Sequence, residues 1–431
     1  MSVVGNPQNS RLRLWLANRS GSWLTVFAVA MAFTCYFCMY SFRKPFAAAT
    51  YENQTLFGLD LKIALVISQV LGYALSKALG IKFNSEISRQ KRAWALAGTI
   101  LWAEGALLLF ALTPPGGQAV AIFLNGLSLG LVWGLVFSFL EGRRTSEVLG
   151  AGLSCSYIVA SGYVKSVGRY LYDSGVPESW MPFTTGALFL PFFLISVWGL
   201  SQLPAPNIKD IETRTRRIPM DGEARWQFFR KYAFGLLVLV AVYVFLTAYR
   251  DFRDNFAVEI WQSLGYGEEP SIFTKTEVPI AICVMAMLAL LSKVKDNRVG
   301  LLCTYVFMTG GALLLIGATW LFDLGLISPM NWMIGVGLGL YLSYVPFGCV
   351  LFDRTIAVLG VAATSVFLIY MSDAAAYTGS VAVLFYKQFG SVDVSYLHFF
   401  RYFSYATGIA TSVLLVVSGL YFFRRAKAAV P

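Results

Sequence analysis

Hydrophobic residues are arranged along this chain in long runs that polar residues interrupt only briefly. Each run is about 20 residues or longer, the length that an α-helix needs to cross the ~30 Å hydrocarbon core of a bilayer. We therefore predict twelve transmembrane helices. The predicted spans cover residues 22–49, 61–83, 93–112, 119–140, 147–172, 181–203, 232–262, 273–292, 299–322, 330–352, 355–386 and 400–423.

A single long polar interval in the middle of the chain, residues 204–231, divides the spans into two sets of six. This pattern predicts an all-α integral membrane protein of two six-helix bundles, residues 1–203 and 232–431, joined by a linker. The apolar run near the N-terminus is longer than the core of a typical signal peptide and leads directly into further spans. We therefore interpret it as an uncleaved first span.

Composition and charge agree with this topology. The chain is 57% hydrophobic and 13% charged, whereas soluble domains are about 45–50% apolar and about 25% charged. Of its 34 lysines and arginines, 23 lie in the termini, the linker and the loops on the same side, and only four lie in the opposite loops. The positive-inside rule places both termini and the linker in the cytoplasm, a pattern that suits a bacterial inner membrane. Topology thus accounts for most of the net charge of +11 without a nucleic-acid partner.

Residue types that usually carry catalysis or bind metals are few. All six cysteines fall within predicted spans, and the C-x-x-C of Cys35 and Cys38 has no second ligand pair. We interpret the cysteines as small packing residues, and we assign no role to the lone His398. The sequence shows no phosphate loop, nucleophile elbow or zinc signature, so we predict no enzyme, no cofactor and no metal site.

Seven basic residues lie inside the predicted spans, where a charge is costly and usually faces a cavity or another charge. They are Arg43, Lys44, Lys77, Lys165, Arg169, Arg250 and Arg253. Their arrangement contains a repeat, because F-R-K-P-F-A at 42–47 returns as F-R-D-N-F-A at 252–257, 210 residues later. The repeat places Arg43 and Arg253 at equivalent positions in the two halves.

Further matches keep nearly the same offset. G-L-S-L-G-L-V-W at 126–133 corresponds to G-L-G-L-Y-L-S-Y at 337–344, and Arg143 corresponds to Arg354. Three positions of the fifth span match three of the eleventh: Ser154, Ser161 and Gly168 with Ser365, Ser372 and Gly379. Matches across three pairs of spans indicate that a six-span unit has been duplicated.

At these residues the chain resembles the organophosphate:phosphate antiporters, the glycerol-3-phosphate and hexose-phosphate branch of the major facilitator superfamily. The resemblance covers the topology of the whole chain and motifs in about four helices. The matching positions are Tyr40 and Arg43-Lys44-Pro45-Phe46; Ser76-Lys77 and Gly80; Gly126, Gly130, Trp133 and Arg143; and Arg253 or, one frame away, Arg250.

The resemblance implies a fold whose two halves rock around a substrate site near the middle of the membrane. In such a fold Arg43 and Arg253 would face each other and clamp a phosphoryl group, because the planar guanidinium fork matches phosphate oxygens. Sequence leaves Arg250 as an alternative second clamp residue. It also leaves open that both arginines snorkel to the outer headgroups.

Two departures from this family affect gating and the motif itself. Asn84 and Ser85 stand where the family usually has an aspartate that locks the cytoplasmic gate, so gating would differ or use Glu86 or Glu141. In the second copy of the motif, Asp254 and Asn255 replace the second basic residue and the proline. We therefore interpret the chain as a divergent relative whose substrate is unknown.

Helical spacing aligns other polar residues into four stripes, which indicate either a wet lining or polar packing between helices. The stripes are Tyr36, Tyr40 and Arg43; Gln69, Tyr73 and Lys77; Ser154, Tyr157, Ser161 and Lys165; and Tyr370, Asp373 and Tyr377. If they line a cavity, Lys77 and Lys165 would add positive field. Tyr40, Tyr73 and Tyr157 would contact the organic part of the substrate or donate hydrogen bonds from their hydroxyls.

Acidic residues inside the spans are few, so we expect a net positive cavity that favours an anion. We identify them as Glu104, Asp251, Asp254 and Asp373, with Glu259 near an end. Arg250 and Asp254 are four residues apart and can pair, which would leave Arg253 less compensated. Three hypotheses stay open for Asp373: a counter-ion to Lys165, a proton-coupling carboxylate, or a group that substrate displaces. Glu104 faces either the cavity or a helix contact.

The sequence therefore predicts a monomeric secondary transporter for phosphate or a phosphorylated metabolite. Phosphate exchange is implied only by the resemblance, and proton coupling through Asp373 is an alternative. Two other functions stay open: a transporter-like anion sensor, and a lipid or lysolipid translocator, which the 16% aromatic content suggests.

Overall fold

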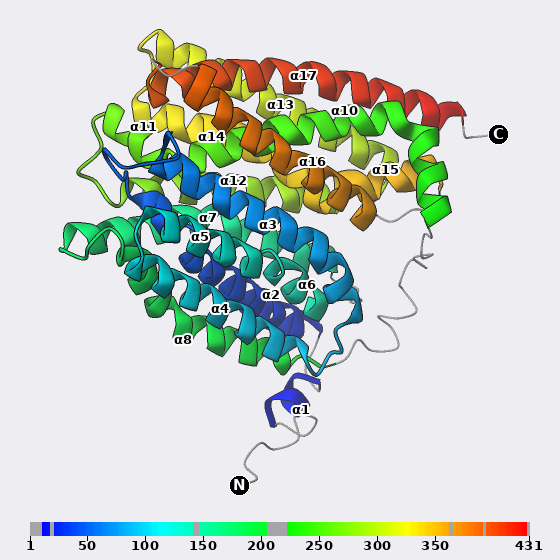
Figure 1. Cartoon of the computed structure of the whole chain (residues 1–431). Coiled ribbons are helices and arrows are strands. Elements are labelled where there is room, and N and C mark those ends of the chain that lie inside the picture. The colour runs from blue at the N-terminus through cyan, green and yellow to red at the C-terminus, as the bar shows by residue number, and fades with distance from the viewer. Residues whose placement is uncertain are drawn as a thin grey trace. The chain divides into compact units, whose positions relative to one another are not determined.

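The computed structural model describes residues 11–17, 21–140, 146–204, 222–361, 365–390 and 394–428, and it is almost entirely helical. Its contacts divide the chain into two compact units, Met1–Thr215 and Arg216–Pro431. We call them the N-terminal unit and the C-terminal unit. In Figure 1 the first is coloured from blue to green and the second from green to red.

The N-terminal unit consists of helices, two short 3₁₀ turns and one small hairpin. The elements are α1 (Arg11–Ala17), α2 (Gly21–Met39), the 3₁₀ turns η2 (Tyr40–Phe42) and η3 (Pro45–Ala48), β1 (Thr55–Leu56), β2 (Leu59–Asp60), α3 (Leu61–Glu86), α4 (Arg92–Leu112), α5 (Pro115–Leu129), α6 (Val132–Leu140), α7 (Ser146–Asp173) and α8 (Met181–Ser201). The two strands pair antiparallel just before α3.

The C-terminal unit is helical throughout its described residues. The elements are α10 (Gly222–Asn255), α11 (Ala257–Ser263), α12 (Ile272–Lys293), α13 (Asn297–Asp323), α14 (Pro329–Cys349), α15 (Leu351–Leu359), α16 (Ser365–Phe385), the π-helical turn η4 (Tyr386–Gly390) and α17 (Tyr396–Ala428).

A helix occurs at each of the twelve predicted span positions. In the part of the chain that the structure describes, nine helices are both long and apolar enough to cross a membrane. The other three are α3, α7 and α16, with 26, 28 and 21 residues, so length alone would allow each to cross. The predicted all-helical membrane architecture is confirmed, and the count of twelve spans stays a prediction.

Packing within each unit confirms the duplication. The five most extensive helix pairings of the N-terminal unit are α3 with α5, α4 with α5, α2 with α7, α2 with α8, and α4 with α8. Those of the C-terminal unit are α12 with α14, α13 with α14, α10 with α16, α10 with α17, and α13 with α17. If the six predicted spans of each unit are numbered in chain order, the two lists name the same five pairs of spans. The two units therefore share one internal architecture.

Glycines allow the closest of these crossings. A Cβ added to Gly126 of α5 would lie 2.4 Å from the carbonyl oxygen of Gln69 in α3, and one added to Gly72 would lie 2.2 Å from that of Phe123. In the C-terminal unit, Gly311 and Gly339 face each other in the same way: a Cβ added to either one would lie 2.6 Å from the carbonyl oxygen of the other. Small residues let helix backbones approach closely in membranes, so the glycine-rich fourth and tenth spans serve packing.

The repeated motif ends the first long helix of each unit. Helix α2 stops at Met39 and continues as the turns η2 and η3, because Pro45 has no N–H to give to a helix. Helix α10 stops at Asn255, and Phe256 has the non-helical angles φ −108° and ψ 22° before α11 begins. At the C-terminal break, Phe256 keeps its backbone bonds to Phe252 and Ile260. In the N-terminal copy, carbonyl oxygens inside the bundle need partners from other helices.

Candidate functional site

Two buried amides hold the broken backbone of the N-terminal motif. Asn125 of α5 donates from Nδ2 to the carbonyl oxygen of Phe42 at 2.9 Å, and Gln69 of α3 donates from Nε2 to that of Arg43 at 3.0 Å. The amides also bond to each other at 3.1 Å. The sequence placed Gln69 on a polar stripe and missed Asn125; here both serve polar packing that fixes the base of Arg43.

The side chain of Arg43 lies among aromatic rings. Its guanidinium carbon is 4.2 Å from the ring centroid of Tyr73 and 5.8 Å from that of Tyr40. Lys77 approaches the same ring, with its Nζ 5.7 Å from the centroid of Tyr73 and 5.5 Å from that of Trp133. The structure thus brings together four residues that sequence assigned to substrate, and cation–π attraction holds both cations. We call Arg43, Tyr40, Tyr73, Lys77 and Trp133 the Arg43 cluster.

Protein encloses the arginines of both motif copies. Arg43 is 8% exposed and Arg253 is 4% exposed. A snorkelling arginine would extend its guanidinium to the membrane surface, so this burial disfavours the snorkelling alternative.

Buried charge differs between the units. Among the described residues, the N-terminal unit buries four basic side chains and one acidic one: Arg43, Lys44, Lys62 and Lys165, with Glu104. The C-terminal unit buries two of each: Arg253 and Lys387, with Asp251 and Glu277. In α7, the predicted contact Tyr157 is half-buried, and Arg169, a further basic residue of the span, pairs with Asp173 at 3.2 Å.

Arg253 is held by a carboxylate that the sequence analysis missed. Its Nη1 donates to Oε1 of Glu277 in α12 at 2.6 Å, and its Nη2 donates to the carbonyl oxygen of Met333 in α14 at 3.1 Å. The expectation that Arg253 is the less compensated arginine is therefore wrong. Our inventory of acids within spans omitted Glu277, although it is the one acid of the predicted span 273–292.

Arg250 belongs to a second polar network of the C-terminal unit. It binds Asp251 through Nη2 at 2.7 Å, and it donates to the hydroxyl of Tyr344, over whose ring it lies at 4.7 Å. Tyr344 in turn bonds to the hydroxyl of Tyr243 at 2.9 Å, and Tyr243 donates to Asp373 at 2.8 Å. Asp373 is therefore linked within its own unit to Arg250.

The fourth and tenth spans present equivalent aromatic rings to cations. Trp133 and Tyr344 end the matching eight-residue segments of the repeat. Lys77 lies over the first ring and Arg250 over the second. The sequence matched these positions without predicting that both would carry a cation.

The predicted gating residues are described only in part. Glu141 and Arg143 lie outside the described residues, as does the side chain of Glu86. Arg354 donates to Asn297 Oδ1 at 2.9 Å and to the carbonyl oxygen of Val294 at 2.8 Å. It thus joins α15 to the start of α13. Asp254, within the second copy of the motif, is half-buried.

Glu104 takes part in a helix contact. It is buried in α4, and neither carboxyl oxygen has a hydrogen-bond partner in the described part of the chain. A Cβ added to Gly186 of α8 would lie 2.2 Å from its Oε2 and 3.1 Å from Phe42. Of the two positions that sequence left open, the structure shows the helix contact. Among the described residues, no three His, Cys, Asp or Glu side chains come together as metal ligands would.

The sequence matches the family described as "Family of unknown function (DUF5690)" over residues 45–425. The chain belongs to this family. By sequence, no curated protein matches it.

Solved structures similar to the chain are transporters. A D-xylose–proton symporter is 12% identical, with a TM-score of 0.62 over 92% of this chain and 97% of its own. A peptide transporter solved with sulfate is 14% identical, with a TM-score of 0.62 over 97% and 99%. A bacterial homologue of the human lysosomal transporter Spinster is 10% identical, with a TM-score of 0.58 over 98% of both chains.

These likenesses extend over almost the whole length of each chain. Together with the duplicated packing and the apolar helices, they show an integral membrane protein with the major facilitator fold. At such low identity they show the fold alone, so substrate and mechanism have to be argued from the side chains.

Proposed function

We propose that the protein is a secondary transporter that moves a small anion, phosphate or a phosphorylated metabolite, by alternating access. The observation that carries the proposal is the excess of buried basic over buried acidic side chains in the N-terminal unit. A charge inside a membrane-spanning bundle is costly and usually serves an ion or substrate pathway. A locally positive interior favours an anion.

The Arg43 cluster is the proposed contact for the anion in the N-terminal unit. Tyr73 holds the guanidinium by its face, so the edge of the planar fork can bind two oxygens of a phosphoryl group. Lys77 adds a second positive charge beside it. Gln69 and Asn125 fix the backbone from which Arg43 extends, so the fork is oriented before the anion arrives.

For the C-terminal unit we propose Arg250, rather than Arg253, as the contact for the anion. The side chain of Arg250 is 19% exposed, whereas that of Arg253 is 5% exposed and bound to both Glu277 and Met333. Arg250 is also linked through Tyr344 and Tyr243 to Asp373. Binding of an anion at Arg250 would therefore act on Asp373, for which proton coupling is one of the three hypotheses.

The test is exchange of labelled inorganic phosphate by proteoliposomes that are preloaded with unlabelled phosphate. We expect exchange by the wild type and a loss of roughly tenfold or more in Arg43→Ala and Arg250→Ala, because each removes charge-assisted hydrogen bonds worth about 1.5–3 kcal/mol. Arg169→Ala is the matched control, since Arg169 pairs within its own helix.

Each outcome of this experiment decides one part of the proposal. No exchange by monodisperse wild-type protein would contradict phosphate exchange and favour the sensor or lipid hypothesis. Exchange that survives Arg43→Ala would contradict the role of the cluster while leaving transport intact. A larger loss in Arg253→Ala than in Arg250→Ala, at equal thermal stability, would reverse our choice between these arginines.

A further inference from the structure

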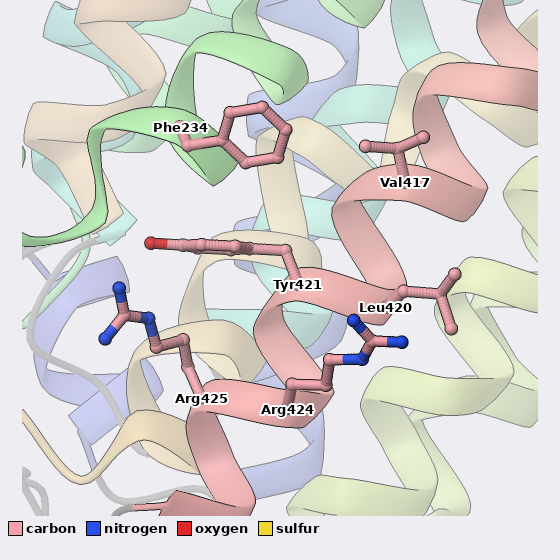
Figure 2. Close-up of a pocket in the computed structure, with 6 residues that line it drawn as sticks. All are labelled: Phe234, Val417, Leu420, Tyr421, Arg424 and Arg425. Carbon is pink, nitrogen blue, oxygen red and sulfur yellow. The ribbon is translucent and has the colours of Figure 1, made fainter.

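A groove with a volume of about 410 Å³ lies between α10 and α17 of the C-terminal unit, and none of the residues discussed above lines it (Figure 2). Six residues line it: Phe234, Val417, Leu420, Tyr421, Arg424 and Arg425. Five of the six come from the last turns of α17. The groove therefore combines an apolar wall with two arginine side chains.

Packing holds the aromatic part of the groove in place. The rings of Phe234 and Tyr421 lie 5.4 Å apart, centroid to centroid. A Cβ added to Gly235 would lie 2.4 Å from Cδ1 of Tyr421, so the absence of a side chain there lets the ring lie directly on α10. Figure 2 shows Tyr421 between Phe234 and the two arginines.

Both arginines are exposed at the polar end of the groove. Arg425 lies 5.5 Å from the ring centroid of Tyr421. In the described part of the chain, neither Arg424 nor Arg425 forms an ion pair with a carboxylate. Figure 2 shows the two side chains diverging from α17, so they spread positive charge over this end of the groove. Exposed guanidiniums attract a group with several anionic oxygens, and phosphate matches the geometry of each planar fork.

The surroundings favour a lipid over a soluble phosphate. Phe234 is 57% exposed and Leu420 is 55% exposed, which suits contact with acyl chains along a membrane-spanning helix. The distribution of lysine and arginine places the end of α17 on the cytoplasmic side, where anionic lipids attract basic residues near the membrane surface. Basic pockets between helices on this side are suited to phospholipid headgroups.

We propose that this groove binds an anionic phospholipid, with its headgroup at the end that Arg424 and Arg425 line and an acyl chain along Phe234, Val417 and Leu420. The lipid would lie against α10 and α17, the first and last long helices of the C-terminal unit. The proposal is independent of what the protein transports, because none of these residues belongs to the Arg43 cluster or to the Arg250 network.

The test is the binding of phosphatidylglycerol to the purified full-length chain in detergent, measured by native mass spectrometry. Phosphatidylcholine with the same acyl chains controls for the apolar contribution, and inorganic phosphate serves as a competitor. The variants are Arg424→Gln with Arg425→Gln, and Phe234→Ala. Lys293→Gln with Lys295→Gln is the control that removes the same charge from exposed residues beyond the groove.

We expect the wild type to bind phosphatidylglycerol roughly tenfold or more tightly than the double arginine variant, since charge-assisted bonds to a phosphate are lost. Phe234→Ala should weaken binding of both lipids, and the lysine control should bind as the wild type does. Equal loss in the lysine control, or equal binding of the two lipids by the wild type, would overturn the proposal. Full displacement by inorganic phosphate would make this an anion site and not a lipid site.

The arginine variants lie on an exposed surface, but their folding can be checked independently. Monodispersity in size-exclusion chromatography together with an unchanged unfolding temperature without added lipid identifies a folded variant. If the double arginine variant fails this check, Phe234→Ala decides alone: retained binding of phosphatidylglycerol at wild-type affinity would then contradict the groove as the binding site.

Discussion

The arginines at the equivalent position of the two motif copies, Arg43 and Arg253, are held in different ways. In the N-terminal unit, Arg43 lies over the ring of Tyr73, and Asn125 of α5 bonds to the motif backbone. In the C-terminal unit, Arg253 itself reaches α14 and bonds to Met333 and to Glu277 of α12. By the offset of the repeat, the position equivalent to Asn125 is Val336, whose side chain has no amide group that could donate such a bond.

This difference shows what duplication retains and what it lets change. Both units keep a break after their first long helix and an arginine close to it. Both motifs also bond to the helix of the fourth or tenth span, but in opposite directions. In the N-terminal unit the amide of Asn125 donates to the motif backbone, and in the C-terminal unit Arg253 of the motif donates to the backbone of α14. The pair with Glu277 therefore supports our proposal that Arg253 has a structural role, while the aromatic environment of Arg43 suits the proposed ligand binding.

The largest effect that we predict tests the structural role of Arg253. Glu277→Gln removes the carboxylate from a buried pair and leaves the guanidinium charge uncompensated, which costs about 3–5 kcal/mol of unfolding free energy. Replacing both partners, Glu277→Leu with Arg253→Met, should restore most of this loss because no buried charge is left. Chemical unfolding of the purified protein in detergent measures both variants.

Glu269→Gln is the matched control for this prediction. Glu269 pairs with Lys275, which lies two residues from Glu277 in α12, but both members of that pair are exposed. Exposed pairs add little to stability, so the control should unfold close to the wild type. If Glu277→Gln is as stable as the control, Arg253 does not depend on this carboxylate.

The general architecture could be predicted from the sequence because it depends on coarse features. Hydrophobic runs of membrane length gave the helix positions, and a register of 210–211 residues gave the duplication. The N-terminal cluster was also accessible, since Tyr73 and Lys77 lie one turn apart on one face of a helix.

Contacts between helices could not be predicted in the same way. Spacing along one helix suggested Asp254 as the partner of Arg250, whereas the structure shows a pair with the adjacent Asp251. Glu277 and Asn125 act on residues 24 and 83 positions away in the chain. Only packing brings such groups together, so a complete inventory of polar residues in the spans would have found these two without assigning their partners.

The second prediction concerns the amide that supports the Arg43 backbone. Asn125→Leu keeps a similar volume but leaves the carbonyl oxygens of Phe42 and Ala103 without this donor. An unsatisfied buried polar group costs about 1–3 kcal/mol, and phosphate exchange should fall as well, because Arg43 loses its fixed base. Val336→Leu, at the equivalent position, should leave exchange closer to wild type. An equal loss of exchange in both variants would show that the effect is general to the bundle.

A third prediction separates the charge of Arg43 from its shape. Arg43→Lys keeps the positive charge but loses the planar fork and its contact with Tyr73, so we expect roughly tenfold slower exchange at nearly unchanged stability. Arg253→Lys should show the opposite pattern, with reduced stability because the geometry of its pair with Glu277 is disturbed. Measuring the exchange rate and the unfolding free energy of both variants tests whether one loses exchange and the other loses stability. Parallel behaviour of the two variants would mean that the units use their arginines alike.

The smallest predicted effect concerns pH and the exposed pair. A hydrogen bond from Lys275 lowers the pKa of Glu269 below its ordinary value of 4.5. A carboxyl group with a lowered pKa in the folded state adds stability above its unfolded pKa, and this contribution is lost as the pH falls through the folded value. The small stability difference between the wild type and Glu269→Gln should therefore be present at neutral pH, decrease as the pH falls below the ordinary pKa of the carboxyl group, and vanish below its lowered pKa in the folded state. A difference that grows on acidification would mean that Glu269 is destabilising when ionised, and it would then be unsuitable as the neutral reference for the buried pair of Arg253 and Glu277.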